Sequence, residues 1–506
     1  SRKTSNFDQN LKDKFVKELY RADITDRNGR YLAKTVSSID IGINPVEIID
    51  QKKLLVNLKL IFPNKNFKEN EKLIKKNKFF WFEKKISEES YERIMKLGDK
   101  SIKPEEKLTR LYPQKNLFSH IVGQIDDDNI GISGLEKTLD RKLKETNKPI
   151  QLTVDEDIQY LIRKELIKFN NIFDANGSAA ILMNVNNGEI LSLVSLPDFD
   201  LNQRQKIEDI NFINRATKGV YELGSVFKTF TLAAALNEKI VETNTEFVDL
   251  EKSIRCGGNT ISEYDLKIPS NLTAEEILIR SGNIGSVRIG QKLGLEKFME
   301  YMNKFDLMNQ MNFDIEEMGV PLKLRWGKCK LATASFGHGI TTTPIQLAKA
   351  YSIVSNGGYE IHPTLIKKDK TEIKKRILDQ EVSFKINNIL RKIVTTKEGT
   401  ASLANVNGYE VGGKTGTAQK IINGNYSNKK INTFASIFPI SNPKFTLVVM
   451  LDEPKTNKDY IYTYRDGSGK YKGTPFNTAG STSVEIVGQI IDKIGPILAT
   501  KYIEVD

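Results

Sequence analysis

A serine and a lysine three residues apart open an apolar, helix-like segment in the middle of the chain. The sequence predicts a turn ending at Gly224 and then a helix, so Ser225 and Lys228 share one helix face and their side chains can meet. An amine in that position can take the proton of a hydroxyl, which is otherwise a poor nucleophile. The start of a helix also offers unpaired backbone N–H groups that suit a developing oxyanion. The pair therefore predicts covalent, nucleophilic catalysis.

The same spacing of serine and lysine occurs at Ser427 with Lys430 and at Ser441 with Lys444. Those two pairs lie in polar, turn-like sequence without an apolar helix behind them. A helix cap beside a solvated lysine is the better explanation of any isolated pair. The Ser225 pair therefore needs support from elsewhere in the chain.

Two further motifs follow in the second half of the chain. Ser281-Gly-Asn283 ends a predicted helix over residues 273–280 and is the one Ser-x-Asn of the sequence. Lys414-Thr-Gly-Thr417 lies on a predicted strand and is also unique. A polar loop pair or a strand-end turn would explain each motif alone. The three motifs in this order are the set found in β-lactamases and penicillin-binding proteins.

The composition is that of a multidomain globular protein. A chain of 506 residues is too long for one ordinary domain, and 39% hydrophobic residues suffice for real cores. The net charge of +12 is compatible with an anionic partner, either nucleic acid or a membrane and cell-wall surface. A general enrichment in lysine explains the larger part of that charge.

The few cysteines and histidines predict no metal site. Two cysteines exclude a disulfide-dense scaffold and any multi-cysteine metal site, and they leave the redox compartment open. We expect Cys256 and Cys329 to be packed and unbridged, and His120 to be a hydrogen-bonded structural residue. No cofactor is expected.

The sequence contains no run of about 18 apolar residues, so it predicts neither a signal peptide nor a membrane span. The chain starts at Ser1, and Phe15, Val16 and Leu19 are already at helical spacing. This start within a pattern indicates that an upstream segment was removed.

The first 150 residues differ in character from the rest. A turn over residues 21–29 precedes a strand whose isoleucines alternate with other residues over 39–43. The basic run from Lys72 to Lys85 contains the four aromatic residues 79–82. Such a run can be a nucleic-acid platform, but a lysine-rich strand with alternate aromatics buried explains it better.

From Gln151 onwards, strands stand on both sides of a helical block. The predicted elements are a helix opened by a capping box from Thr153 to Glu156, a hairpin of strands 178–185 and 189–194 joined by Asn187-Gly188, a capped helix over 343–351, strands over 410–420, 433–440 and 445–451, and a closing helix over 483–494. Strands from both ends of this region should join in one sheet with helices against it.

With these motifs in place, the chain resembles the class B penicillin-binding proteins, most closely the septal, cell-division type (penicillin-binding protein 3). The matching stretches are Ile24–Gly29, Arg110–Pro113, His120, Gly134–Lys137, Asn186–Glu189, Glu222–Ser225, Ser335–Ile340 and Thr343-Pro344. The stretch around His338 is closer to the septal than to the elongation branch and should shape the wall of the cleft. Leu223, Gly282 and Ala22 stand where proline, serine and glycine are usual; none of them is a reacting group.

The resemblance implies an α+β, multi-domain fold. Residues 1–150 would form an N-terminal pedestal for dimerisation or interaction, and residues 151–506 a penicillin-binding transpeptidase domain with a five-stranded antiparallel sheet flanked by helices. It also implies one N-terminal inner-membrane anchor, absent from this chain, and a periplasmic catalytic domain. The implied partners are stem peptides ending in D-Ala-D-Ala, β-lactams, and division-machinery membrane proteins bound through the pedestal and the anchor; no nucleic acid is expected.

The implied activity is a peptidoglycan D,D-transpeptidase that cross-links stem peptides at the division septum through a serine acyl-enzyme. Ser225 is the expected nucleophile. Lys228 is the expected base, held neutral by burial and by the charge of Lys414. Ser281 is expected to relay a proton to the departing D-Ala amine, and Asn283 to hydrogen-bond the donor peptide.

Substrate binding is expected from the third motif. Its residues are Thr415, Gly416 and Thr417, and the two hydroxyls together with Lys414 would recognise the terminal carboxylate. The resemblance places the oxyanion between the backbone N–H groups of Ser225 and Thr417.

Other functions stay open as alternatives. An elongation-type class B transpeptidase shares the motifs. A β-lactamase shares the reacting groups, but no Glu-x-x-Leu-Asn lies between Asn283 and Lys414, and a leading domain has no role there. A Ser-His-Asp hydrolase would need a Gly-x-Ser-x-Gly elbow. An inactive β-lactam-binding scaffold or sensor would not need intact motifs, and 150 residues are too few for a glycosyltransferase domain.

Overall fold

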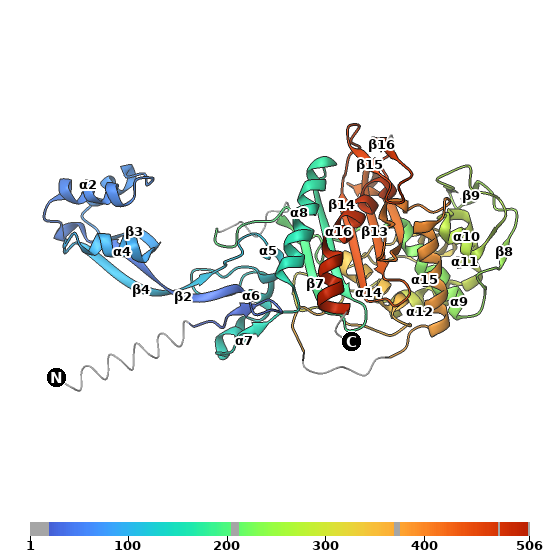
Figure 1. The fold of residues 1–506 in the computed structure, drawn as a ribbon, viewed down its shortest axis with the longest axis horizontal. Helices are drawn as coiled ribbons and strands as arrows, with labels where there is room; N and C mark the ends of the chain where they lie inside the picture. Colours follow the sequence, from blue (N-terminus) through green and yellow to red (C-terminus); the bar gives the residue numbers. More distant parts are fainter. Residues whose placement is uncertain (1–19, 204–211, 369–374, 474–475, 504–506) are drawn as a thin grey trace.

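The molecule is elongated, with residues 31–111 projecting away from a larger body of helices and sheet (Figure 1). The computed structural model describes residues 20–203, 212–368, 375–473 and 476–503. The helical pattern of Phe15, Val16 and Leu19 lies outside these residues. Within the described ranges, no helix is long and apolar enough to cross a membrane.

A long strand, β2 (Tyr31–Ile43), is the spine of the projecting part. It pairs antiparallel with β4 (Ile102–Leu111), with β3 (Phe80–Ile86) at its outer end and with β1 (Ile24–Thr25) at its inner end, and β1 pairs in parallel with β5 (Ile150–Gln151). Helices α2 (Gln51–Ile61), α3 (Lys68–Lys75) and α4 (Glu88–Met95), with a 3-10 turn (Pro45–Glu47), lie at the outer end. The alternating isoleucines predicted this strand, because Ile41 and Ile43 fill the small core there.

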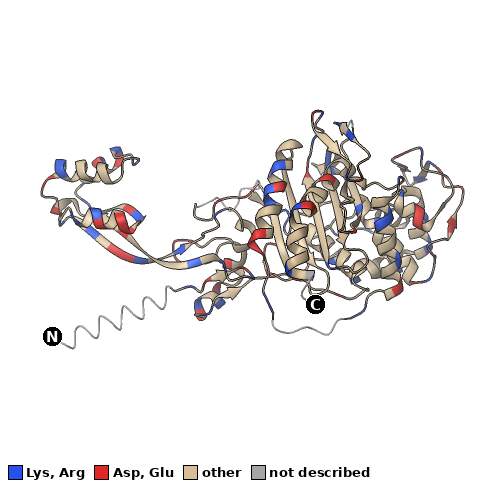
Figure 2. Cartoon of the chain, in the orientation of Figure 1, with Lys and Arg blue, Asp and Glu red and all other residues tan. Residues whose placement is uncertain are grey.

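The aromatic run forms a strand whose alternate side chains are buried, as predicted. Phe80 and Phe82 are buried, whereas Phe79 and Trp81 are 48% and 37% exposed. Basic and acidic residues are interspersed along this part of the chain (Figure 2). One example is the 2.6 Å ion pair between Lys65 and Glu83.

Three short helices, α5 (Ser119–Val122), α6 (Gly134–Thr138) and α7 (Asp140–Glu145), join the projecting part to the body. Glu136 of α6 is fully buried between two arginines, Arg21 and Arg110, and its bond to Arg110 Nε measures 2.7 Å. The His120 ring lies 2.9 Å from the Pro197 carbonyl oxygen and is a hydrogen-bonded structural residue, as expected.

The body is organised on one five-stranded antiparallel sheet, which confirms the predicted fold. Its order is β12 (Gly412–Ile422), β13 (Asn425–Phe438), β14 (Phe445–Asp452), β6 (Gly177–Asn184) and β7 (Ile190–Leu196), so strands from both ends of this region meet in it. Helices α8 (Glu156–Ile172) and α16 (Ser483–Leu498) pack together on the sheet, and α14 (Pro344–Ser355) packs on it as well.

The remaining elements build the helical block and the loops around it. They are a 3-10 turn (Gly224–Phe227), α9 (Lys228–Asn237), β8 (Glu246–Phe247), β9 (Ser253–Cys256), β10 (Asn259–Ser262), β11 (Leu272–Thr273), α10 (Ala274–Ile279), α11 (Asn283–Leu293), α12 (Leu295–Lys304), α13 (Lys328–Ala334), α15 (Gln380–Thr395), 3-10 turns (Ser402–Ala404 and Ala479–Ser481), β15 (Ile461–Thr463), β16 (Lys470–Lys472) and a π-helical turn (Ala499–Ile503).

One predicted cap is wrong. The Asp155 carboxylate caps α8, accepting from the backbone N–H groups of Asp157 and Ile158. The Thr153 hydroxyl instead bonds the carbonyls of Ile190 and Thr364. Thr153 cannot serve, because it lies two residues before the cap position and its buried hydroxyl is already bonded to these two carbonyls.

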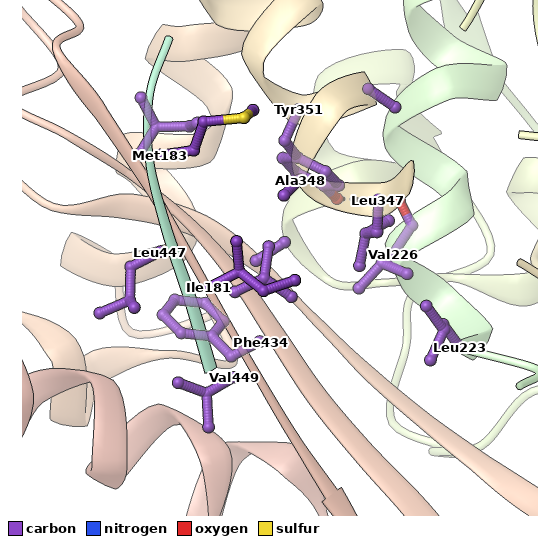
Figure 3. Packing of buried hydrophobic residues seen from close by; sticks show 14 of the residues in the cluster. Ile181, Met183, Leu223, Val226, Leu347, Ala348, Tyr351, Phe434, Leu447 and Val449 are labelled. Atoms are coloured by element: carbon purple, nitrogen blue, oxygen red, sulfur yellow. Dashed lines mark hydrogen bonds between the residues drawn. The ribbon is translucent and has the colours of Figure 1, made fainter. Parts of the chain in front are cut away.

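The sheet supports the Ser225 turn through a dense apolar layer (Figure 3). Ile181 and Phe434 of the sheet, Tyr351 of α14 and Val226 of the turn are all completely buried in it. The Tyr351 hydroxyl donates to the Val226 carbonyl oxygen at 2.8 Å and lies 2.9 Å from the Thr229 hydroxyl. The turn is thereby fixed to the rigid centre of the fold.

Candidate active site

Ser225 lies in a 3-10 turn over Gly224–Phe227 that continues directly into α9; the sequence predicts a turn ending at Gly224, so the regular helix begins later than expected, at Lys228. Gly224 has a φ of +65°, and a Cβ added there would lie 3.0 Å from the Thr417 carbonyl oxygen, so glycine fits the turn best. The Ser225 side chain is half-buried, and its hydroxyl has no hydrogen bond within the part of the chain that the structure describes. Ser427 lies on β13 and Ser441 in the turn before β14, so neither opens a helix.

The Lys228 amine is buried one helical turn from Ser225. Its Nζ donates to the Ser281 carbonyl oxygen at 2.6 Å and to Asn283 Oδ1 at 2.7 Å, and it lies 3.2 Å from Ser281 Oγ. Burial lowers the pKa of Lys228 to about 7, and the carboxylate of Glu263 opposes that shift. The amine can therefore hold or release a proton near neutral pH.

Ser281 is held in a left-handed backbone conformation, with a φ of +57°. It follows α10 in a Schellman motif, in which Gly282 N–H bonds the Ile277 carbonyl at 2.9 Å and Ser281 N–H bonds the Leu278 carbonyl at 3.2 Å. Glycine is the usual residue at this position, because a Cβ costs about 1 kcal/mol there. Ser281 occupies this position despite that cost, and its hydroxyl contacts the amines of both Lys228 and Lys414.

Because of this backbone conformation, two variants of Ser281 should differ in stability but not in activity. We expect Ser281→Gly to resist denaturant better than Ser281→Ala by about 1 kcal/mol, because glycine alone relaxes the left-handed backbone. Both variants lose the same hydroxyl, so both should acylate equally slowly with penicillin. Denaturant midpoints and acylation rates measure the two effects. Equal stability of the two variants would contradict the strain argument.

Lys414 reaches the same hydroxyl from the sheet. It lies on the edge strand β12, is fully buried, and its Nζ donates to Ser281 Oγ at 2.8 Å and to the Thr415 carbonyl at 3.0 Å. Burial, and then the nearby charge of Lys228, hold the pKa of Lys414 well below its ordinary value. We expected burial and the charge of Lys414 together to keep Lys228 neutral; burial is the cause that lowers the pKa of Lys228, and Lys414 is not among the causes.

The structure thus brings the three motifs together. Lys228, Ser281, Asn283 and Lys414 form one hydrogen-bonded cluster, with Ser281 Oγ accepting from both lysines. Since that oxygen accepts twice, its own proton is free to be donated elsewhere. Ser225 joins the cluster through α9 and through the contact of its turn with β12.

The third motif presents two faces, because side chains alternate along a strand. Gly416 faces the Ser225 turn, and a Cβ there would lie 2.1 Å from the Leu223 carbonyl oxygen, so glycine permits the close approach. The Thr415 hydroxyl lies 2.7 Å from that of Thr400, and the Thr417 hydroxyl accepts from Ala479 N–H at 2.9 Å. Of the three, Thr417 is the one that is half-exposed.

A stack of aromatic rings lies beside the turn, where a wall of the cleft was expected. The ring of His338 stacks on Phe336 and, at 4.7 Å between centroids, on Tyr426. The Tyr426 hydroxyl donates to the Glu222 carboxylate at 3.0 Å. Gly337, between the two stacked residues, approaches the Gly224 carbonyl so closely that a Cβ would overlap it.

The expectation of unbridged cysteines is wrong. Cys256 and Cys329 form a disulfide, with their Cα atoms 5.4 Å apart. The bond joins β9 to α13 across 73 residues of sequence, and nothing in either local pattern indicates the pairing. A stable disulfide is typical of proteins that work in an oxidising compartment.

Two neighbours of the cluster were missed from the sequence. Thr400 contacts the third motif as described above, and Glu263 contacts the second. The Glu263 carboxylate accepts from the backbone N–H groups of Asn283 and Ile284 at 2.7 and 2.8 Å. Both residues lie in loop-rich sequence with no periodicity, so no local signal could have identified them.

Known proteins share this architecture over most of the chain. Residues 178–474 match the family model of the penicillin-binding protein transpeptidase domain, and residues 17–167 match the penicillin-binding protein dimerisation domain. The chain is 29% identical to the probable peptidoglycan D,D-transpeptidase FtsI of Caulobacter vibrioides, over 95% of this chain and 82% of that protein. It is 31% identical to stage V sporulation protein D of Bacillus subtilis, over 86% of this chain and 74% of that protein.

A solved structure shows the same likeness. Penicillin-binding protein 3 of Mycobacterium tuberculosis aligns with a TM-score of 0.71 over 96% of each chain. At 21% sequence identity, this match concerns the fold alone.

Proposed function

The chain belongs to the penicillin-binding protein transpeptidases, and from this premise we propose that it is a septal-type peptidoglycan D,D-transpeptidase that acts through an acyl-enzyme on Ser225. The observation that carries the proposal is the cluster in which Lys228, Ser281 and Lys414 meet beside the Ser225 turn. Its substrates are stem peptides ending in D-Ala-D-Ala, and β-lactams acylate the same serine.

In the acylation step, neutral Lys228 takes the Ser225 proton as Oγ attacks the carbonyl carbon of the penultimate D-Ala. The oxyanion lies between the N–H groups of Ser225 and Thr417, which is supported by the contact between the Ser225 turn and β12. The peptide C–N bond then breaks. Ser281 donates its free proton to the departing D-Ala amine and is reprotonated from a lysine.

The substrate is oriented by the groups around this cluster. Asn283 hydrogen-bonds the donor peptide. The terminal carboxylate is assigned to the hydroxyls of Thr415 and Thr417 together with the Lys414 amine, since all three groups can donate hydrogen bonds to it. Gly416 lets the edge strand approach the Ser225 turn, so its role in binding is to keep that strand in place.

In the second step, an amine from a neighbouring stem peptide attacks the acyl carbon. The ester bond to Ser225 breaks, an amide bond forms, and the serine recovers its proton. A β-lactamase would instead use a water held by its own base, and the sequence offers no motif for one between the second and third motifs. Slow release of bound penicillin therefore accompanies the proposed reaction.

The proposed location is the periplasmic face of the inner membrane, where peptidoglycan is assembled. An N-terminal anchor preceding this chain would hold the enzyme there, with residues 1–150 as a pedestal between anchor and catalytic domain. Division-machinery proteins would bind the pedestal and the anchor. The Cys256–Cys329 disulfide supports an oxidising compartment such as the periplasm.

A donor-acceptor assay tests the function. The protein is incubated with a stem peptide ending in D-Ala-D-Ala and a second peptide that carries a free side-chain amine. We expect release of D-Ala together with a cross-linked product, and neither after preincubation with penicillin. Hydrolysed donor without any cross-linked product would indicate a carboxypeptidase or hydrolase instead.

The pH dependence of acylation follows from the buried base. Since burial lowers the pKa of Lys228 to about 7, the neutral amine is the minor form below that pH and the main form above it. The second-order rate of acylation by a fluorescent penicillin should rise with pH through about 7 and then level off. A rate still rising above about pH 9 would instead indicate a lysine with an ordinary pKa.

A further inference from the structure

Three successive residues at the end of the β9–β10 hairpin, the last residue of β10 and the two that follow it, hold the second motif. The Ser262 carbonyl accepts from Asn283 Nδ2 at 2.8 Å, and the Glu263 carboxylate accepts from the N–H groups of Asn283 and Ile284. The Tyr264 hydroxyl donates to the Arg280 carbonyl at 2.8 Å. These contacts lie on both sides of Ser281, so the segment determines where Ser281 and Asn283 stand.

Glu263 replaces a local helix cap. Helix α11 starts after Gly282, which has no side chain to cap it, so its first N–H groups need acceptors from elsewhere. A carboxylate at a helix N-terminus also interacts favourably with the helix dipole. Glu263 is 9% exposed and satisfies two of these N–H groups, which is why it is held firmly in this interior position.

The hairpin that carries Glu263 is itself anchored. Cys256, at the end of β9, is bonded to Cys329 of α13. The end of α13 is fixed in turn to α9, because the Thr231 hydroxyl donates to the Ser335 carbonyl at 2.8 Å. The disulfide thus links the segment bearing Glu263 to the helix bearing Lys228.

We propose that Glu263 is a positioning residue of this reaction: it caps α11 from a distance and presents a negative charge to the buried amine of Lys228. The inference rests on the proposed function, since it assigns how the base of that reaction is held and tuned. Nothing in the three motifs themselves supplies a negative charge to this cluster.

The charge has a defined chemical effect. The titratable groups that face Lys228 are Lys414 from β12 and Glu263 from the segment after β10. Burial alone would make Lys228 a weaker base than it is, and the carboxylate opposes this by favouring the protonated amine. A base that is too weak transfers the serine proton poorly, so Glu263 keeps the strength of Lys228 matched to neutral pH.

Two variants separate the charge from the cap. In Glu263→Gln the negative charge is lost, so the pKa of Lys228 falls. The rise of the acylation rate with pH, here called the acid limb, should therefore move to lower pH by about one unit. Its plateau rate should fall by less than about tenfold, because the amine becomes a weaker base. In Glu263→Asp the charge remains, so the limb should stay at the wild-type pH even if the shorter side chain slows the reaction. Glu251→Gln, an exposed residue ahead of the same hairpin, should match the wild type in both respects.

The measurement is the rate of acylation by a fluorescent penicillin between about pH 5 and pH 9, with thermal unfolding of each variant alongside. A limb that stays in place in Glu263→Gln, or that moves equally in Glu263→Asp, would overturn the inference and leave a structural cap only. If the wild type is not acylated on Ser225, the proposed function itself fails, which is a separate result.

Discussion

Replacing Ser225 with alanine is expected to abolish covalent uptake of penicillin. The Ser225 hydroxyl forms the ester in the proposed acylation, and it lies in the 3-10 turn that leads into α9, beside the Lys228–Ser281–Lys414 cluster. A fluorescent penicillin followed on a denaturing gel should label the wild type and leave Ser225→Ala unlabelled. Because the side chain is half-buried and makes no hydrogen bond in the described chain, the variant should fold normally.

The chain supplies a matched control for that experiment. Ser441 also stands three residues before a lysine, but it is exposed in the turn that precedes β14. Ser441→Ala should therefore be labelled like the wild type. If labelling survived in Ser225→Ala and disappeared in Ser441→Ala, the nucleophile would be Ser441, and the assignment to Ser225 would be wrong.

Replacing Lys228 with methionine should have the second largest effect. Methionine fills the buried space without an amine, so the variant loses the base, and acylation should slow by about 10²- to 10⁴-fold. The rise of the rate through pH 7 should disappear with it, since the titrating group is gone. Stopped-flow or gel-based acylation rates at several pH values measure both effects.

Lys239→Met is the corresponding control, because Lys239 is exposed just beyond the end of the same helix. It should keep the wild-type rate and pH dependence. A Lys228→Met variant that retains the pH 7 limb would assign that titration to another group. Lys414, whose pKa is also lowered, would then be the first candidate.

Much of this fold follows from local patterns in the sequence. The alternating isoleucines of β2 and the Asn187-Gly188 turn between β6 and β7 require only neighbouring residues, and both predictions are confirmed. The capping threonines of α10 and α14, Thr273 and Thr343, are equally local signals. The cap of α8 was misassigned to Thr153 because an acidic residue closer to the helix competes for the same N–H groups.

The site was predictable only where a motif carries it. The three motifs identify the lysines and serines, but their meeting at Ser281 Oγ depends on how α9, α10 and β12 pack. Glu263 and the disulfide between Cys256 and Cys329 act over long sequence separations, with no pattern in their own neighbourhoods. The left-handed backbone conformation of Ser281 also could not be predicted from residue propensities, since serine rarely adopts it.

These long-range contacts also change the electrostatic account of the site. From the motifs, Lys228 is expected to be neutral because it is buried and because Lys414 lies near it. The packed structure buries both amines and lowers the pKa of each, but at Lys228 the charge that acts is the carboxylate of Glu263, which opposes the shift. The pKa of Lys228 lies near 7 because burial lowers it and the Glu263 carboxylate opposes that shift.

Mapping the site of acylation by mass spectrometry tests the central claim most directly. Trypsin cuts after Lys218 and Lys228 and releases the peptide 219–228, which contains Ser225 as its one serine and no threonine. After incubation of the native protein with penicillin, the account predicts that the penicilloyl adduct lies on this peptide alone. An adduct on the peptide that begins at Ser281, or no adduct on residues 219–228, would contradict it.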